Sequence, residues 1–351
     1  MRNVSRRSFL GAGASTFTII RPELVRGAGA EKLKAGIVGC GGRGTGAIEQ
    51  ILEGNPNVEL VAMADVFEDK LELCLKRIGN DKRFAATKDR VKVAPDKRFT
   101  GFDAFKKVIA SDVDIVMLTT PPGYRPEHFE AAINAGKHVF CEKPIATDPV
   151  GVRRFIESAK KARDKKLTVM SGSQRRSASD YIQTREKVQG GAIGEILACY
   201  SNYLSGPVMH AKARDPRWGD MEWEHRNWYS FLWICGDQIV EQHYHNIDCM
   251  NWFMGAHPVK VVASGGVAWR PAEELYGNIY DHMSSDFVYP NGVHYVSHCR
   301  QYPQGLCRIV NDLIIGSKGK TTCSDMGAKS EVNSQVQEHI NMVKSILGQG
   351  P

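Results

Sequence analysis

Leu33-Lys-Ala-Gly-Ile-Val-Gly-Cys-Gly-Gly-Arg-Gly-Thr-Gly46 is the stretch of sequence that decides the fold. Its apolar start, residues 35–38, predicts a strand, and the glycines after it have the spacing G-x-G-x-x-G. The next apolar residues recur at the spacing of one buried helix face: Ala47, Ile48, Ile51 and Leu52. A strand, a glycine loop and a helix in this order favour a site for the pyrophosphate of a dinucleotide over a simple glycine-rich turn.

Each glycine of the loop has its own predicted role. Gly39 allows a tight turn, Gly41 lets the backbone approach a pyrophosphate, and Gly44 lets the helix pack closely on the strand. The start of the helix adds unpaired N–H groups and the positive end of the helix dipole. We therefore expect the cofactor to contact five residues of this loop: Gly39, Gly41, Gly42, Arg43 and Gly44.

A second apolar run covers residues 58–65 and ends in Asp65, 21 residues after Gly44. A carboxylate at this place accepts hydrogen bonds from the ribose hydroxyls of adenosine and repels a 2′-phosphate. The sequence therefore favours NAD over NADP as the cofactor, although Arg43 weakens this preference.

Strand and helix patterns continue to alternate, with strands at 112–120, 137–141 and 168–172 and helices at 127–135 and 149–165. This order predicts an α/β fold with a doubly wound parallel sheet. We expect a Rossmann domain at residues 31–155, with the strand near 168–172 added to its sheet. Because ligands bind outside the carboxyl ends of parallel strands, Thr120 and Pro121 are expected beside the cofactor.

Residues 1–30 are predicted to lie outside the fold as a signal peptide. Ser5-Arg6-Arg7-Ser8-Phe9-Leu10 is a twin-arginine pattern, and Ala28-Gly29-Ala30 suits a signal peptidase. We expect export by the twin-arginine route to the periplasm or another extracytoplasmic space. A disordered basic leader or a retained anchor is the alternative, but the apolar stretch is too short for a stable membrane span.

Composition argues against several partners. The leader holds five Arg and one Glu, so its removal lowers the formal net charge from +7 to +3. No stripe of Lys and Arg with interleaved aromatics is present, so nucleic acid is not an expected partner. The nine cysteines form no C-x-x-C pair, and we expect buried free thiols rather than disulfides or a zinc site.

Several motifs occur together in the first half of the chain: Gly39-Cys-Gly-Gly-Arg-Gly44, Thr120-Pro121, His128 and Ala135-Gly-Lys-His-Val-Phe-Cys-Glu-Lys-Pro144. In this combination the chain resembles the glucose–fructose oxidoreductase/inositol dehydrogenase (Gfo/Idh/MocA) family over roughly residues 33–346. The resemblance implies a second, α/β domain at residues 156–351 with an open, mostly antiparallel sheet. In similar proteins this sheet often forms the oligomer interface, so a homo-oligomer is implied. Similar proteins usually continue further, and we expect the C-terminus to be truncated.

Lys143 lies in Glu142-Lys143-Pro144, directly after the predicted strand 137–141. Oxidation of a hydroxyl removes a hydride and a proton, and a lysine near the nicotinamide can hydrogen-bond the reacting oxygen and stabilise its charge. The resemblance implies that Lys143 is catalytic and that Glu142 and Lys143 border the cofactor. A surface lysine in a turn is the alternative.

A helix is predicted over residues 235–255, with Glu241, His245 and Asp248 on one face. The family has the pattern G-x-x-x-x-D-x-G-x-H-x-x-D here, and this chain has Glu241 and His243 in place of the aspartate and the glycine. The resemblance makes His245 the proton acceptor, titrating near working pH, with Glu241 orienting it or binding a substrate hydroxyl. A core histidine is the alternative. No metal is expected, because His243 would point away from the pocket face.

Residues 207–229 are rich in aromatic and charged side chains, a composition that suits sugar rings. A locally packed loop is the alternative. Four residues are expected to bind substrate: Gln174, Arg175, Trp228 and Asp248. Alternating runs between 259 and 323, with Pro290-Asn-Gly292 as a hairpin turn, are typical of antiparallel strands.

These observations predict an exported NAD(H)-dependent oxidoreductase that acts on a secondary hydroxyl of a sugar, polyol or glycoside by hydride transfer. Since free NAD is not supplied outside the cytoplasm, we expect a tightly bound cofactor. Two alternatives stay open. One is a glycoside hydrolase that uses transient oxidation by bound NAD, and the other is a non-catalytic relative that binds carbohydrate or nucleotide.

Overall fold

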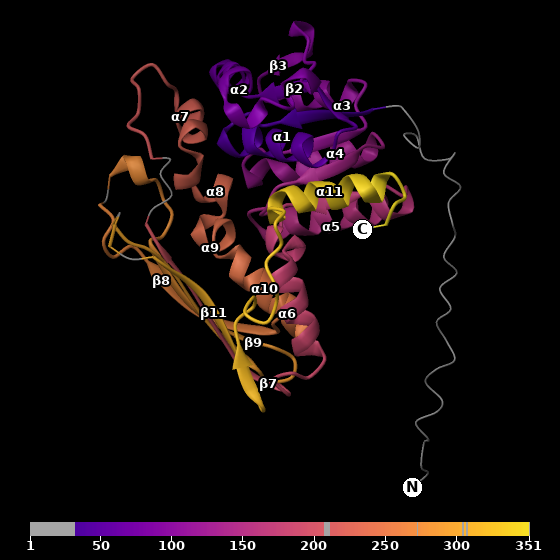
Figure 1. Ribbon diagram of the computed structural model, residues 1–351. Coiled ribbons are helices and arrows are strands. Elements are labelled where there is room, and N and C mark those ends of the chain that lie inside the picture. Colours follow the sequence, from indigo (N-terminus) through magenta and orange to yellow (C-terminus); the bar gives the residue numbers. More distant parts are fainter. Residues whose placement is uncertain (1–31, 207–210, 272, 304, 307, 351) are drawn as a thin grey trace.

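Two six-stranded sheets, each with its own helices, form the framework of the chain (Figure 1). The computed structural model describes residues 32–206, 211–271, 273–303, 305–306 and 308–350. The predicted twin-arginine leader lies outside these residues.

The first sheet is parallel throughout and has the strand order β3-β2-β1-β4-β5-β6. Its strands are β1 (Leu33–Val38), β2 (Val58–Asp65), β3 (Arg98–Thr100), β4 (Ile115–Leu118), β5 (His138–Cys141) and β6 (Val169–Ser171). The chain order reverses between β1 and β4, which is where ligands bind in open sheets of this kind. The predicted doubly wound parallel sheet is confirmed.

Helices cover both faces of this sheet. One face carries α1 (Gly42–Gly54), α2 (Glu68–Asn80) and the last helix, α11 (Ser334–Ile346). The other carries α3 (Ala104–Ala110), α4 (Arg125–Asn134) and α5 (Pro149–Asp164). The predicted apolar face of the first helix is confirmed, because its four residues Ala47, Ile48, Ile51 and Leu52 are fully buried.

The second sheet is mixed and mostly antiparallel, as expected, with the order β12-β11-β7-β10-β9-β8. Its strands are β7 (Ile196–Ser205), β8 (Lys260–Gly266), β9 (His282–Val288), β10 (His294–Gln301), β11 (Ile309–Gly316) and β12 (Gly319–Thr321). Only β7 and β10 run parallel among its pairs. Two helices, α6 (Ser179–Gln189) and α10 (Tyr244–Met254), pack their apolar residues against this sheet.

The predicted hairpin after β9 is confirmed. Val288 and His294 are register partners across it, and Gly292 has φ +81°, a conformation that glycine adopts without strain.

Three short helices lie between the two sheets: α7 (Asp220–Arg226), α8 (Leu232–Cys235) and α9 (Asp237–Glu241) (Figure 1). The prediction of one continuous helix over residues 235–255 is wrong. Gly236 and Asp237 have positive φ, and Gln242 and His243 form a turn between α9 and α10. The i, i+4 spacing of Glu241 and His245 therefore does not place them on one helix face.

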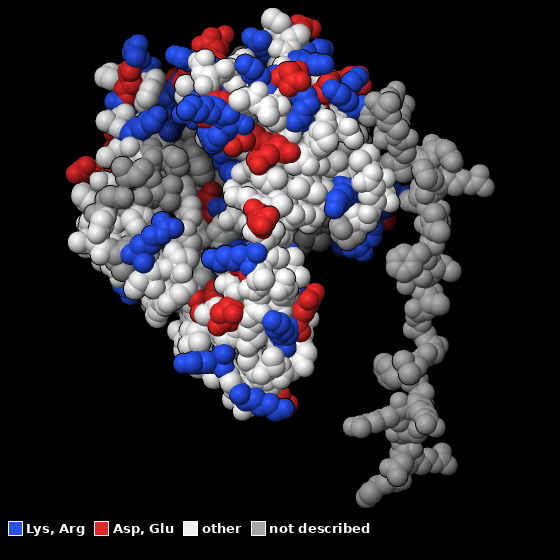
Figure 2. All heavy atoms as spheres, in the orientation of Figure 1, with Lys and Arg blue, Asp and Glu red and all other residues white. Residues whose placement is uncertain are grey.

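Three features of the structure can be compared with the sequence: the surface charge, the cysteines and the hydropathy of the helices. Lys and Arg are interspersed with Asp and Glu over the face shown in Figure 2. The eight cysteines among the described residues are free and buried, as expected. No described helix has both the length and the hydropathy needed to cross a bilayer.

Candidate active site

The glycine loop between β1 and α1 has the geometry that its sequence predicts. Gly39 has φ +101°, and a Cβ there would lie 2.8 Å from the backbone nitrogen of Thr120. A Cβ on Gly44 would lie 1.9 Å from the carbonyl oxygen of Gly39. Substituents on Gly41 and Gly42 would meet no atom within 4 Å. The first and last glycines therefore serve the packing of the loop, while Gly41 and Gly42 leave open space above it.

That open space belongs to a cleft of about 260 Å³ at the carboxyl ends of β1, β2 and β4. Gly41, Arg43, Asp65, Thr120 and Pro121 line it. Helix α1 has no side-chain cap at its start, so its first N–H groups are available to an anion. Residues with no side chain beside an uncapped helix start fit the pyrophosphate of a dinucleotide.

Asp65 ends β2 at the rim of the cleft. Its Oδ2 accepts a hydrogen bond from the backbone N–H of Cys40 at 2.6 Å, and its Oδ1 accepts one from the N–H of Phe67 at 3.0 Å. Burial raises the pKa of this carboxyl, and the two backbone donors act against the rise. Each oxygen keeps a second acceptor position, which fits the ribose hydroxyls of an adenosine.

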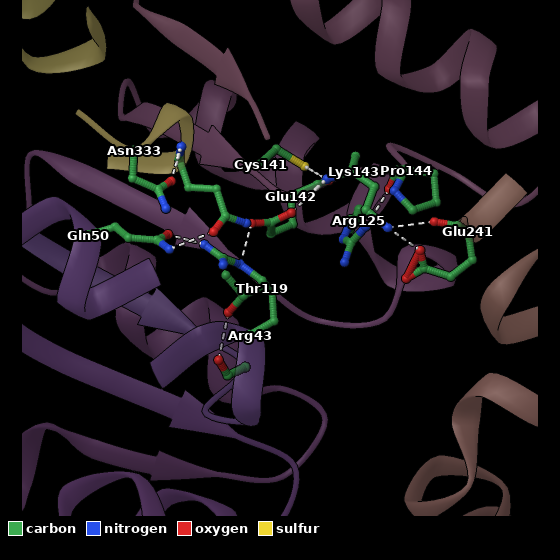
Figure 3. Close-up of polar contacts among 12 residues, drawn as sticks. Arg43, Gln50, Thr119, Arg125, Cys141, Glu142, Lys143, Pro144, Glu241 and Asn333 are labelled. Atoms are coloured by element: carbon green, nitrogen blue, oxygen red, sulfur yellow. Dashed lines mark hydrogen bonds and ion pairs between the residues drawn. The ribbon is translucent and has the colours of Figure 1, made fainter. Parts of the chain in front are cut away.

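Arg43 reaches from the loop to the residue before Lys143 (Figure 3). Its Nε lies 2.6 Å from Oε1 of the buried Glu142, and its Nη2 donates to Gln50. Glu142 also accepts a hydrogen bond from the backbone N–H of Lys143 at 3.2 Å. Arg43 lines the cleft, but its charge is paired with Glu142 and is not free to hold a 2′-phosphate.

Thr120 and His128 form the floor of the cleft beside β4. The Thr120 hydroxyl and Nδ1 of His128 are 3.3 Å apart, and the His128 ring stacks on Phe105 with centroids 4.1 Å apart. Burial lowers the pKa of His128 to about 4. The ring is therefore neutral at ordinary pH and packs like an aromatic side chain.

Lys143 follows β5, and its side chain points toward α9, where it meets Glu241 (Figure 3). Its Nζ lies 2.6 Å from Oε2 and 2.5 Å from the backbone oxygen of Glu241. The Lys143–Pro144 peptide bond is cis, and Arg125 donates a hydrogen bond to the Pro144 carbonyl at 2.5 Å. Burial raises the pKa of Glu241, and the positive charge of Lys143 acts against that rise. The predicted partner of Glu241 was His245, and the structure pairs it with Lys143 instead.

His245 begins the first turn of α10, close enough to Lys143 for the two to interact electrostatically. Its carbonyl oxygen accepts a hydrogen bond from Arg175 at 3.2 Å, while its ring makes no hydrogen bond to a described residue. Burial lowers the pKa of His245 well below its usual range, and the charges of Lys143 and Arg175 lower it further. The imidazole is therefore neutral, and it does not titrate near neutral pH as we expected.

The other expected substrate residues lie at two places in the structure. Asp248 forms a two-pronged ion pair with Arg176, with Nη2 to Oδ1 at 2.8 Å and Nε to Oδ2 at 2.9 Å. Trp228 lines the cleft of the glycine loop. Gln174 starts a 3₁₀ turn (Gln174–Ser177) and its side chain makes no hydrogen bond to a described residue. Arg175 donates a hydrogen bond to the backbone carbonyl of His245. The 3₁₀ turn with Gln174 and Arg175 thus lies against α10, which carries Asp248, whereas Trp228 lies at the cleft of the glycine loop.

His243 is fully buried in the turn between α9 and α10. Neither ring nitrogen has a hydrogen-bond partner among the described residues, and burial lowers the pKa of His243 to about 3. Among the described residues, no group of three or more His, Cys, Asp or Glu side chains is arranged to hold a metal ion.

Lys70 and Tyr124, which line the cleft, were absent from the sequence prediction. Three more, Lys212, His225 and Arg226, come from the run 207–229, which we expected at the substrate. Charged and aromatic side chains are interspersed in that run, and this composition indicates a binding site without distinguishing a cofactor from a substrate.

Two models of known protein families match the chain. Residues 33–171 match a family model described as "Oxidoreductase family, NAD-binding Rossmann fold". Residues 181–321 match the model of the GFO/IDH/MocA C-terminal domain. The two matches cover all the strands of both sheets.

Three individual relatives share only about a fifth to a quarter of their aligned residues with this chain. An inositol 2-dehydrogenase of Salmonella typhimurium is 26% identical over 223 residues, which are 63% of this chain and 54% of that protein. The chain thus spans about half the length of the curated relatives that it matches. An aldose–aldose oxidoreductase of Caulobacter crescentus superposes with a TM-score of 0.69 at 19% identity, over 91% of both chains. A scyllo-inositol dehydrogenase of Lactobacillus casei with bound NAD(H) and scyllo-inositol has a TM-score of 0.68 at 21% identity, over 91% of this chain and 90% of that one. At this identity the two structures show a shared fold.

Proposed function

The chain belongs to the Gfo/Idh/MocA family of oxidoreductases, and from this we propose that it transfers a hydride between NAD(H) and a secondary hydroxyl of a polyol or sugar. The observation that carries the proposal is the contact of Lys143 with Glu241. It sets a partly buried ammonium group at the carboxyl end of β5, on the same edge of the sheet as the glycine loop.

The residues of the cleft suit the pyrophosphate and the adenosine ribose of the cofactor. The start of α1 and the open side of Gly41 and Gly42 would receive the pyrophosphate, and Asp65 would receive the adenosine ribose. When bound, the nicotinamide supplies the acceptor for the hydride. Asp65 and the pairing of Arg43 with Glu142 both favour NAD over NADP.

Lys143, Glu241 and His245 would bind the substrate hydroxyl and accept the proton that it loses. The reaction converts CH–OH and NAD⁺ to C=O, NADH and one proton. The Lys143 ammonium would donate a hydrogen bond to the substrate oxygen, and Glu241 would hold that ammonium in place. Burial and the neighbouring cations keep the imidazole of His245 neutral, so one ring nitrogen is free to accept the proton, but the lowered pKa also makes the ring a weak base.

A substrate screen tests this proposal. The purified chain is incubated with NAD⁺ and a panel of inositols, aldoses and alditols, and NADH formation is followed by absorbance. Formation of NADH with a polyol or sugar supports the proposal. Release of nitrophenol from a nitrophenyl glycoside with no net NADH would replace it by the redox glycoside hydrolase. Failure of both reactions, with carbohydrate or nucleotide binding retained, would favour the non-catalytic relative.

We further propose that NAD stays tightly bound, because the predicted leader would carry the folded protein away from the supply of free cofactor. Mass spectrometry of the denatured protein checks for NAD at one equivalent. Cell fractionation checks the export, which Arg6→Lys with Arg7→Lys is expected to block.

Assembly into a homo-oligomer is proposed through the second sheet. Its edge strand β8 exposes Val261 at 54% and Val262 at 76%, and an exposed apolar strand edge is a candidate site for pairing with another chain. Val262→Glu is expected to lower the mass measured by light scattering, and an unchanged mass would place the interface elsewhere.

A further inference from the structure

Part of the second half of the chain closes over the cofactor cleft. Residues 211–235, here called the strap, include α7 and α8, and Figure 1 shows α7 beside α2 of the first domain. Lys212, His225 and Arg226 of the strap line the same cleft as the glycine loop. The cleft therefore has a wall on the side opposite the Rossmann sheet.

Arg226 fastens the strap to the adenosine end of the cleft. Its Nη1 and Nη2 donate to the two carboxylate oxygens of Asp69, each at 3.0 Å, and its Nε donates to Glu222 at 2.8 Å. The guanidinium also lies 3.9 Å from the ring centroid of Phe67. Phe67 and Asp69 follow Asp65 closely, so this contact sits beside the expected ribose site. Paired, parallel hydrogen bonds of this kind are among the stronger polar contacts of proteins.

His225 fastens the strap to the end of β4. Its Nε2 is hydrogen-bonded to the Tyr124 hydroxyl, and its Nδ1 to the backbone carbonyl of Met221. Since a carbonyl only accepts, Nδ1 carries the proton and Nε2 accepts from Tyr124. The ring also meets Phe102 edge-on, with centroids 5.0 Å apart. Two consecutive residues thus hold the strap at both ends of the cleft.

Two further side chains, both positively charged, would favour an anion in the closed cleft. Lys70 of α2 and Lys212 of the strap both line it, and neither makes a salt bridge to a described residue. Burial lowers the pKa of Lys70, and the charge of Lys212 lowers it further. Repulsion between the two ammonium groups opposes closure of the empty cleft, and a bound phosphate group would relieve it.

We propose that the strap is a latch for the dinucleotide: His225 and Arg226 hold it shut over the bound cofactor, and the cofactor leaves only when these contacts open. This inference rests on the proposed function in taking NAD(H) as the occupant. It explains how a cofactor would be retained through many turnovers without a covalent bond.

The test measures cofactor release rather than turnover. The full chain is loaded with NADH, excess NAD⁺ is added, and the loss of bound-NADH fluorescence gives the dissociation rate. Arg226→Gln and Asp69→Asn are each expected to raise this rate about tenfold or more, and the double variant no further, because both remove the same contact. Arg217→Gln is the matched control: Arg217 lies on the strap, its side chain is 85% exposed, and it pairs with Asp215 away from the cleft.

Hydrogen exchange of the cofactor-free protein provides a second readout. Arg226→Gln and Tyr124→Phe should speed amide exchange in residues 220–235, while Arg217→Gln should not. Dissociation of NADH from Arg226→Gln at the wild-type rate overturns the latch and leaves the proposed function intact. A wild-type chain that binds no NADH overturns the proposed function, and the latch with it.

Discussion

Nζ of Lys143 lies 2.6 Å from Oε2 of Glu241. The two residues belong to different halves of the chain: Lys143 follows β5 of the first sheet, and Glu241 ends α9, just before the helix α10 that packs on the second sheet. Their side chains are 14% and 8% exposed. The ammonium group is therefore held in place only when the two halves of the chain are packed together. The contact that we propose to be catalytic therefore depends on the relative position of the two halves.

Lys143→Met should abolish most turnover while cofactor binding remains. The substitution keeps much of the side-chain volume but removes the hydrogen bond to the substrate oxygen, a contribution worth roughly 10²–10⁴-fold in rate. Steady-state kinetics with the substrate found in the screen measure kcat, and NADH fluorescence measures binding. Lys160→Met, at an exposed site on α5, serves as the control. A Lys143→Met variant with wild-type kcat would remove Lys143 from the mechanism.

Glu241→Gln should lower kcat by roughly 10–100-fold with little change in NADH affinity, because the ammonium loses its charged partner but the cleft is untouched. Glu241→Asp should recover part of the loss, since it restores the carboxylate on a shorter arm. Kinetics and NADH titration of both variants separate this role from general destabilisation. Equal losses in Gln and Asp variants, accompanied by a lower melting temperature, would indicate a structural role instead.

Gly41→Ala and Gly44→Ala should fail in different ways. A methyl group on Gly44 would overlap the Gly39 carbonyl, so this variant should lose folded yield or stability. A methyl group on Gly41 would meet no protein atom, so the variant should fold normally but bind NADH about tenfold or more weakly, because the methyl enters the space for the pyrophosphate. Thermal unfolding and NADH titration distinguish the two. Normal NADH binding by Gly41→Ala would place the pyrophosphate elsewhere.

The first sheet could be predicted closely because its signals are local. The predicted strand at 58–65 coincides with β2 (Val58–Asp65), and the glycine loop has the predicted turn and close approach. In a doubly wound sheet each strand is a short apolar run, and each connection carries its own turn residues. Such patterns can be recognised in the sequence without knowing which helix or strand packs against each element.

The partners of the site residues were much less predictable. Glu241 contacts Lys143, 98 positions away, and Asp248 contacts Arg176, 72 positions away. No periodicity encodes these pairs, because they follow from the packing of one half of the chain on the other. The interruption at Gln242 and His243 also overrides a helical pattern that continues through it, and this turn decides which way Glu241 points.

Helix α11 hides a second cluster that its amphipathic sequence did not reveal. Glu338 is 1% exposed, and its Oε2 has no hydrogen-bond partner within the part of the chain that the structure describes. Burial raises its pKa to about 9, and the negative charge of Glu142 contributes to the rise. Its neighbour His339 is fully buried, and burial lowers the pKa of His339 to about 3. The helix therefore docks with both groups neutral.

Glu338→Gln should stabilise the protein increasingly as pH rises. A carboxyl with a folded-state pKa of about 9 and an unfolded value of 4.5 keeps its proton only in the folded state between these limits. In that window the folded chain binds more protons, so wild-type stability falls with rising pH by about 1.4 kcal/mol per pH unit from this group. The glutamine variant lacks this loss. Its melting temperature, measured from pH 5 to pH 9, should rise relative to wild type across the range, whereas the exposed Glu331→Gln should show a constant difference. A constant difference for Glu338→Gln as well would mean that Glu338 is ionised in the folded protein.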